Sequence, residues 1–404
     1  MSQIVLQREN YSKVFYSYIL TIYLASSVIN WLPLIDASLV RGVKYFFFII
    51  IFLYELRNNN LKFPSFFLSP FGLIVILLSM LFGLLLSFRL NALIDIVIPF
   101  LMLWVFNHDR NFYYRAIFRA AMIVSFICVL SIGSNFTGIY NVQPPGWDFS
   151  FGQAGFGGYS TGYSNSLFLF VPFLIFWHRR NNKPLISIET IAIVIIIIAQ
   201  YLTGGRGGFL ASGIVFFLSF RIHFFYKIVL IGSLAFIAQS QSFLEQMRIS
   251  TLNRDRIDVN RISTGRVELT AYYFEKFKER PVFGYGFGPK EEINKNVDVH
   301  IVWLRNAVDG GIIYLLLLVI LFIEILRTFL KNKTLEDDER KLFRTLFFVS
   351  FLITFLEPNY LIGSVQGEIV YWLLISLLLK KIVFRNKPGH HYSPSIEEKD
   401  MAYQ

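Results

Sequence analysis

The stretch Arg280-Pro-Val-Phe-Gly-Tyr-Gly-Phe-Gly288 lies in a polar segment, residues 241–300, of a chain that is otherwise largely apolar. This segment is rich in arginine and lysine and ends at His300. About nine apolar runs precede it and about three follow it, most of them long enough to cross a bilayer as helices. A membrane protein that keeps one such polar segment between its spans is expected to use it as its functional part.

The composition of the chain argues against a soluble protein. Its 404 residues are 55% hydrophobic, and only 16% are charged, whereas soluble domains average about 25% charged residues. The net charge of +11 does not indicate binding of nucleic acid, because most Lys and Arg residues lie in short loops between apolar runs. The single cysteine, Cys128, excludes an internal disulfide bond. A polytopic membrane protein is therefore predicted.

The apolar runs predict an all-α polytopic membrane protein with about twelve transmembrane helices and one large outer loop that contains short helices. About nine helices lie in residues 1–240, the loop covers residues 241–306, about three helices lie in residues 307–384, and residues 385–404 form a tail. The expected spans are near residues 14–34, 44–56, 70–88, 90–106, 114–133, 161–177, 185–202, 207–221, 225–240, 307–326, 342–357 and 367–384.

The distribution of basic residues predicts the orientation of these helices. With the N-terminus inside, the short loops that carry most Lys and Arg residues lie in the cytoplasm, as the positive-inside rule requires. Both termini are then cytoplasmic and residues 241–300 face outside. Long translocated loops do not follow the charge rule, so the basic character of this segment agrees with an outer position.

Within the polar segment, residues 264–280 are expected to form an amphipathic helix on the outer face. Thr264 suits the N-cap, Pro281 ends the helix, and the glycines that follow permit a tight turn. A helix that rests on the membrane surface explains the aromatic residues but not Arg266 in its first turn. The expected apolar face consists of Val267, Tyr272, Phe274 and Phe277.

A histidine and two arginines are the main candidates for chemistry on the outer face. The orientation places only His300 of the 6 histidines outside, and histidine is well suited to accept a proton near neutral pH. Arg206 lies within Thr203-Gly-Gly-Arg-Gly-Gly208, where glycines can bring backbone amides close to an anion. Arg206 and Arg266 together suit a diphosphate. The alternatives are a plain turn with a snorkelling arginine and a structural histidine.

Acidic residues near the ends of the spans give a second set of candidates. Asp309 either orients His300 or a substrate, or it is a structural partner of Arg305. No Asp-x-Asp motif lies in the expected outer loops, so neither a metal nor another cofactor is predicted. Asp255 and Asp258 leave a weak alternative of metal binding.

Hydroxyl and amide groups gather at the start of the sixth expected span. The segment Tyr159-Ser-Thr-Gly-Tyr-Ser-Asn-Ser166 contains Tyr163 and Asn165, whose polar groups suit sugar hydroxyls. Helix capping is the alternative explanation for this segment. Tyr285, in the glycine-rich turn, is a further candidate for binding substrate.

Three pieces of the chain resemble the bacterial O-antigen polymerases and O-antigen ligases, which share one membrane domain. They occur in the family's order, and Thr161-Gly-Tyr-Ser-Asn-Ser166 also resembles a segment common among the polymerases. Two departures are that Ile301 follows His300 where the family has Asn, and that Asp309 stands where Glu is frequent. The pieces are Gly-Gly-Arg-Gly-Gly208 with Phe-Leu-Ala-Ser, Thr264-Gly-Arg-Val-Glu-Leu leading to Pro281-Val-Phe-Gly-Tyr-Gly, and His300-Ile-Val-Trp-Leu leading to Val308-Asp-Gly-Gly-Ile.

The resemblance implies a GT-C-like, metal-independent glycosyltransferase of the bacterial inner membrane with a periplasmic active site. Arg206 and Arg266 would bind the diphosphate of an undecaprenyl-diphosphate-linked oligosaccharide, and His300 would act as the general base. The implied partners are this substrate, membrane lipid and a chain-length regulator protein.

The resemblance leaves the acceptor open. A polymerase transfers the chain to another lipid-linked repeat unit, whereas a ligase transfers it to the lipid A core. The Thr161-Gly-Tyr-Ser-Asn segment and the composition favour the polymerase. The alternatives from other classes are a lipid-linked glycan transporter or flippase, for which few polar residues lie within the spans, and a binding scaffold, which would not need His300.

Overall fold

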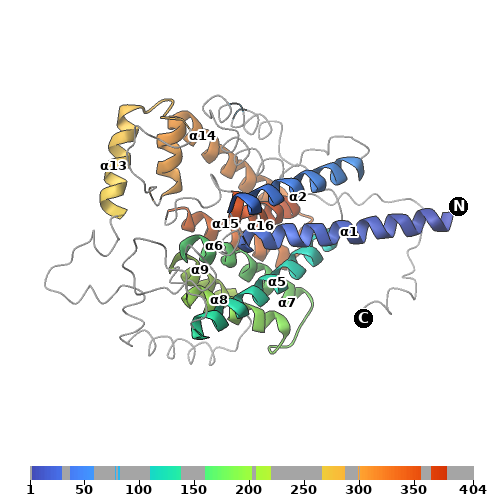
Figure 1. Ribbon diagram of the computed structural model, residues 1–404. Coiled ribbons are helices and arrows are strands. Elements are labelled where there is room, and N and C mark those ends of the chain that lie inside the picture. Colours follow the sequence, from blue (N-terminus) through green and yellow to red (C-terminus); the bar gives the residue numbers. More distant parts are fainter. Residues whose placement is uncertain are drawn as a thin grey trace.

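The computed structural model describes residues 2–29, 37–58, 78, 81, 110–137, 160–202, 206–219, 266–286, 299, 301–355 and 365–379. The regular secondary structure of these residues is helical throughout (Figure 1). The helices are α1 (Ser2–Ile29), α2 (Ala37–Asn58), α5 (Arg110–Thr137), α6 (Ser160–Phe168), α7 (Phe170–Arg180), α8 (Ile188–Leu202), α9 (Arg206–Ser219), α13 (Arg266–Glu279), α14 (Val302–Lys331), α15 (Asp337–Ile353) and α16 (Val365–Leu379).

Three of the described helices are long and apolar enough to cross a membrane: Ser12–Ile29 within α1, Arg110–Ser134 within α5, and Val302–Lys331. Shorter apolar helices are formed by α8, most of α9 and the end of α16. The spans expected near residues 70–88, 90–106 and 225–240 lie outside the described residues, apart from helical Leu78 and Leu81. The prediction of an all-α membrane protein is confirmed for the described part, while the number of spans stays a prediction.

The sixth expected span is formed by α6 and α7, which join at Leu169. This residue keeps helical dihedral angles, φ −62° and ψ −24°. Pro172 has no backbone N–H, and its ring crowds the carbonyl group four residues earlier, at Phe168. The proline therefore interrupts the hydrogen bonds of the helix at this junction, while the chain continues in a helical conformation.

The helix bundle has two chemically different ends. At one end, Arg110 at the start of α5 donates a hydrogen bond of 2.8 Å to Glu339 in α15, and Arg180 at the end of α7 lies 3.5 Å from the same carboxylate. At the other end, the N–H of Val302 donates to the carbonyl oxygen of Thr354 at 2.9 Å. We call the first end the ionic end. We call the second the glycine end, because the turn after α13, with its glycines, lies at that end.

The ionic end is held together by a buried ion pair. The side chains of Arg110 and Glu339 are only 6% and 3% exposed. The Tyr114 hydroxyl donates to Glu339 at 2.9 Å, and the N–H of Glu336 donates to it at 3.2 Å, which closes a capping box on α15. One carboxylate therefore connects α5 to the first turn of α15 and, through Arg180, to α7.

We predict that Glu339→Gln lowers the free energy of unfolding by about 3 kcal/mol, because it leaves Arg110 as a buried charge without its carboxylate. The matched control is Glu336→Gln on the same turn, whose side chain is 61% exposed and whose change should cost less than about 1 kcal/mol. Thermal unfolding of the protein purified in detergent measures both. Equal shifts in unfolding temperature for the two variants would show that the buried ion pair stabilises the protein no more than the exposed one.

Candidate functional site

Helix α13 packs against α14 (Figure 1). Leu269 and Tyr273 lie one turn apart on α13 and are buried in a small apolar cluster with Val299 and Val308. Residues four apart share one face of a helix, so these two side chains define the face of α13 that is turned toward the protein.

The helix expected at residues 264–280 is confirmed as α13, and the residues of its expected apolar face have different surroundings. Val267 and Phe274 are 51% and 49% exposed, whereas Tyr272 and Phe277 pack at the margin of the cluster. The contact with residues 299–308 selects the buried face, and hydrophobicity alone did not reveal it. Thr264, the expected N-cap, lies outside the described residues.

Arg266 is the first residue of α13 and is partly buried. It precedes Leu269 by three residues and Tyr273 by seven, which places it on the same side of the helix. Leu269 and Tyr273 belong to one buried cluster with Val299, the residue before His300 in the sequence. His300 itself lies outside the described residues.

The turn after α13 is hydrogen-bonded to a break in α14. Gly311 leaves the helical conformation, with φ 68° and ψ −174°, which frees backbone groups of α14 for partners outside the helix. We call the turn and the break, residues 281–286 and 308–312, the glycine clamp. It is joined by backbone hydrogen bonds of 2.8 Å from Tyr285 to Val308, from Gly286 to Asp309 and from Ile312 to Pro281.

Two glycines of the clamp cannot be replaced without moving the backbone. Gly284 has φ +67°, and a Cβ there would lie 2.5 Å from the carbonyl oxygen of Asp309. Gly311 has φ +68°, and a Cβ there would overlap the carbonyl group of Val282. Both the positive φ and the close approach of two backbones require glycine. A glycine inside an apolar helical run signals a break, but nothing in the sequence identified the turn as its partner.

Asp309 is a buried residue of the clamp, and its carboxylate lies 3.7 Å from the Arg305 guanidinium. This contact favours the structural alternative, in which Asp309 is the partner of Arg305. The backbone of Asp309 also accepts a clamp hydrogen bond from Gly286. The candidate therefore helps to shape the site whether or not it touches a substrate.

Tyr285 turns its side chain back toward the end of α13. Its hydroxyl donates to Glu279 at 2.5 Å, and the Arg280 guanidinium lies 4.6 Å from the centre of its ring. Hydrogen bonds from Tyr285 and then Lys276 hold the pKa of Glu279 below its ordinary value. Burial and the nearby Glu279 raise the pKa of Tyr285. These side chains form a polar group beside the clamp.

A second group of candidate residues lies where α6, α8 and α9 meet. Gln200, near the end of α8, donates to the carbonyl oxygen of Ser164 in α6 at 2.7 Å. A Cβ on Gly208 would lie 2.5 Å from that same oxygen, so this glycine allows α9 to approach α6. Two segments that the sequence singled out, residues 159–166 and 203–208, are therefore neighbours. Arg206 begins α9, and its side chain lies outside the described residues.

Tyr163 and Asn165 occupy different environments in α6. Tyr163 is fully buried, and its hydroxyl lies 3.7 Å from the sulfur of Cys128 in α5, so its contacts are with the core. Asn165 is 6% exposed, and its side-chain oxygen has no hydrogen-bond partner among the described residues. Of these two candidates, Asn165 is the one that offers an acceptor to a ligand.

The family model described as O-antigen ligase matches residues 191–319 of the chain. This span includes the glycine clamp and the positions of Arg206, Arg266 and His300. The match confirms the resemblance to the O-antigen ligase and polymerase family and does not separate the two activities. No curated protein matches the chain.

We predict that Gly284→Ala and Gly311→Ala each disrupt the clamp, because the added methyl group displaces a hydrogen-bonded backbone. Both variants should lower the unfolding temperature in detergent and speed proteolysis of residues 281–286. Gly213→Ala is the matched control, since no atom lies within 4 Å of a Cβ at that position in α9. If the control is destabilised as much as the clamp variants, helix packing in general, and not the clamp, explains the effect.

Proposed function

We propose, from the premise that residues 191–319 carry the domain of the O-antigen ligase and polymerase family, that this membrane protein is a glycosyltransferase that polymerises O-antigen. Its substrate would be a repeat unit linked to undecaprenyl diphosphate. The observation that carries the proposal is that the matched span contains Arg206, Arg266 and His300 together. Their chemistry fits an anionic leaving group and a hydroxyl nucleophile.

In the proposed reaction a hydroxyl oxygen of the acceptor sugar attacks the anomeric carbon of the donor glycan. His300 accepts the proton of that hydroxyl, as a general base. The bond between the anomeric carbon and the diphosphate oxygen breaks as the new glycosidic bond forms. Arg206 and Arg266 stabilise the negative charge on the departing undecaprenyl diphosphate with planar, permanently charged donors. No cofactor takes part, and independence of metal is part of the proposal.

The packing around α13 supports these roles. The face of α13 that follows Arg266 contacts Val299, next to His300. The glycine clamp ties the end of α13 to α14 through backbone hydrogen bonds. A reaction that needs several groups in one fixed geometry gains from such a rigid connection. Asn165, with its buried side-chain oxygen, is a proposed contact for sugar hydroxyls, and Tyr285 and Asp309 are further proposed contacts for the substrate.

We propose that the glycine end faces the periplasm and the ionic end the cytoplasm of a bacterial inner membrane. The arginines Arg110, Arg179 and Arg180 gather at the ionic end, as expected for a cytoplasmic side. The apolar surfaces of the spans would hold the polyprenyl tail. A chain-length regulator protein is a further proposed partner.

The acceptor distinguishes polymerase from ligase. The polymerase is favoured by Thr161-Gly-Tyr-Ser-Asn, which lies outside the matched span. The ligase is the second candidate, because the matching family model carries that description. A lipid-linked glycan transporter or flippase is the more distant alternative, and transfer activity in purified protein would exclude transport as the sole function.

We predict that His300→Ala abolishes long-chain glycan while the protein is still inserted in the membrane, because the acceptor hydroxyl loses its base. The measurement is the lipopolysaccharide banding pattern of a deletion strain that expresses the variant, with membrane levels checked by immunoblot. Single repeat units left on the core would indicate a polymerase, and a core without any glycan a ligase. Normal chain lengths from His300→Ala would refute the assignment of the base.

We predict that Arg206→Lys and Arg266→Lys recover little of the activity lost in the alanine variants, because an ammonium group cannot offer a planar fork to a diphosphate. A loss of at least tenfold in polymer formation is expected for each, with Arg327→Lys as the control, because that side chain is 54% exposed near the other end of α14. Full activity of both lysine variants would show that these arginines do not recognise the diphosphate by bidentate hydrogen bonding.

A further inference from the structure

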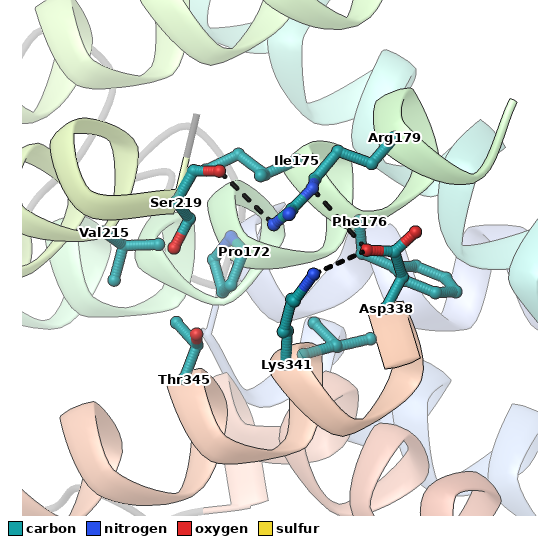
Figure 2. Close-up of a pocket in the computed structure, with 10 residues that line it drawn as sticks. Pro172, Ile175, Phe176, Arg179, Val215, Ser219, Asp338, Lys341 and Thr345 are labelled. Atoms are coloured by element: carbon teal, nitrogen blue, oxygen red, sulfur yellow. Dashed lines mark hydrogen bonds and ion pairs between the residues drawn. The ribbon is translucent and has the colours of Figure 1, made fainter. Parts of the chain in front are cut away.

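A pocket lies at the ionic end between α7, α9 and α15 (Figure 2). Arg179, Asp338 and Lys341 form its polar side, and Ile175 and Val215 belong to its apolar side. The pocket is at the opposite end of the bundle from the glycine clamp. None of the residues proposed for sugar transfer lines it.

The polar side of the pocket carries an excess of positive charge. Arg179 Nε and Lys341 Nζ each lie 3.6 Å from the same oxygen of Asp338, so one carboxylate faces two cations. Figure 2 shows both cationic side chains directed at Asp338 from different helices. The neighbouring ion pairs contain equal numbers of cations and carboxylates and do not offset the excess: Arg110 and Arg180 with Glu336 and Glu339.

The cationic donors of the pocket are not saturated by Asp338. A direct N–H···O hydrogen bond measures about 2.7–3.2 Å, and both contacts to Asp338 are longer than that. Arg179 donates through another nitrogen to the carbonyl oxygen of Ser219 at 3.3 Å, but its Nε is buried without a hydrogen-bond partner among the described residues. A buried donor of this kind costs free energy unless a further acceptor meets it.

An apolar stripe leads away from the pocket along α15. Lys341, Thr345, Phe348 and Leu352 follow each other at spacings of four, three and four residues, which places them on one face of the helix. Phe348 and Leu352 are 51% and 62% exposed. These two exposed apolar side chains continue the face of α15 that begins at the charged side of the pocket.

We propose that this pocket binds an anionic phospholipid of the surrounding bilayer. Its phosphate lies between Arg179 and Lys341, where it supplies the missing acceptor and balances the excess charge. Its acyl chains lie along Phe348 and Leu352. The site is independent of the proposed glycosyl transfer, and it joins α7, α9 and α15 at the ionic end.

The test uses full-length protein, purified in detergent and stripped of lipid, with binding followed by native mass spectrometry. Phosphatidylglycerol, phosphatidylcholine and inorganic phosphate are added separately. We expect Lys341→Gln to weaken the binding of phosphatidylglycerol roughly fivefold, the effect of one basic residue on an anionic lipid. Lys333→Gln is the matched control, because it removes the same charge from an exposed turn of the same end and should leave the affinity unchanged.

A second variant, Thr345→Phe, fills the pocket without changing its charge and should weaken the binding of phosphatidylglycerol as well. Equal losses of affinity for phosphatidylglycerol in Lys341→Gln and Lys333→Gln would overturn the proposal, since nonspecific electrostatic attraction would then explain the binding. Equal affinities for phosphatidylcholine and phosphatidylglycerol would overturn the proposal that the site prefers an anionic headgroup. If inorganic phosphate saturates the site at the same concentration as phosphatidylglycerol does, the proposal that a lipid occupies the site would be overturned.

Discussion

The pairing of freed backbone groups at Gly311 is the constraint on which the candidate site depends. In a membrane protein, backbone N–H and C=O groups that leave a helix must find partners, because hydrocarbon offers none. The break in α14 is tolerated because the turn after α13 fills it: Tyr285 and Gly286 donate hydrogen bonds to α14, and Pro281 accepts one from Ile312. The position of α13, and with it that of Arg266, follows from this backbone connection and from the apolar contact of Leu269 and Tyr273.

The two ends of the bundle are stabilised by different physical means. The ionic end depends on charge: one buried carboxylate, Glu339, holds side chains from α5 and α7. The glycine end depends on close approach, because Gly208, Gly284 and Gly311 let backbones come nearer than any side chain would allow. One end therefore depends on keeping a charge, and the other on keeping side chains small.

Sequence reasoning predicted the elements better than their contacts. The all-α membrane architecture follows from composition, and Pro281 with the following glycines predicted where α13 stops, at Glu279. The buried face of α13 was not predictable, because Val267 and Phe274 are as apolar as Leu269, and a distant segment decides among them. For the same reason the proximity of Gly208 to Ser164 appeared only in the structure. Asp309 was left with two roles, and only coordinates could favour the contact with Arg305.

The glycine clamp is held together by main-chain hydrogen bonds. Val282 and Phe283 are 46% and 60% exposed, and their side chains take no part in the clamp's hydrogen bonds. New side chains at these two positions would leave the frame intact. For the proposed transferase, the surface beside the candidate site could therefore be refashioned to suit a different sugar, while the backbone scaffold beneath it is inherited unaltered.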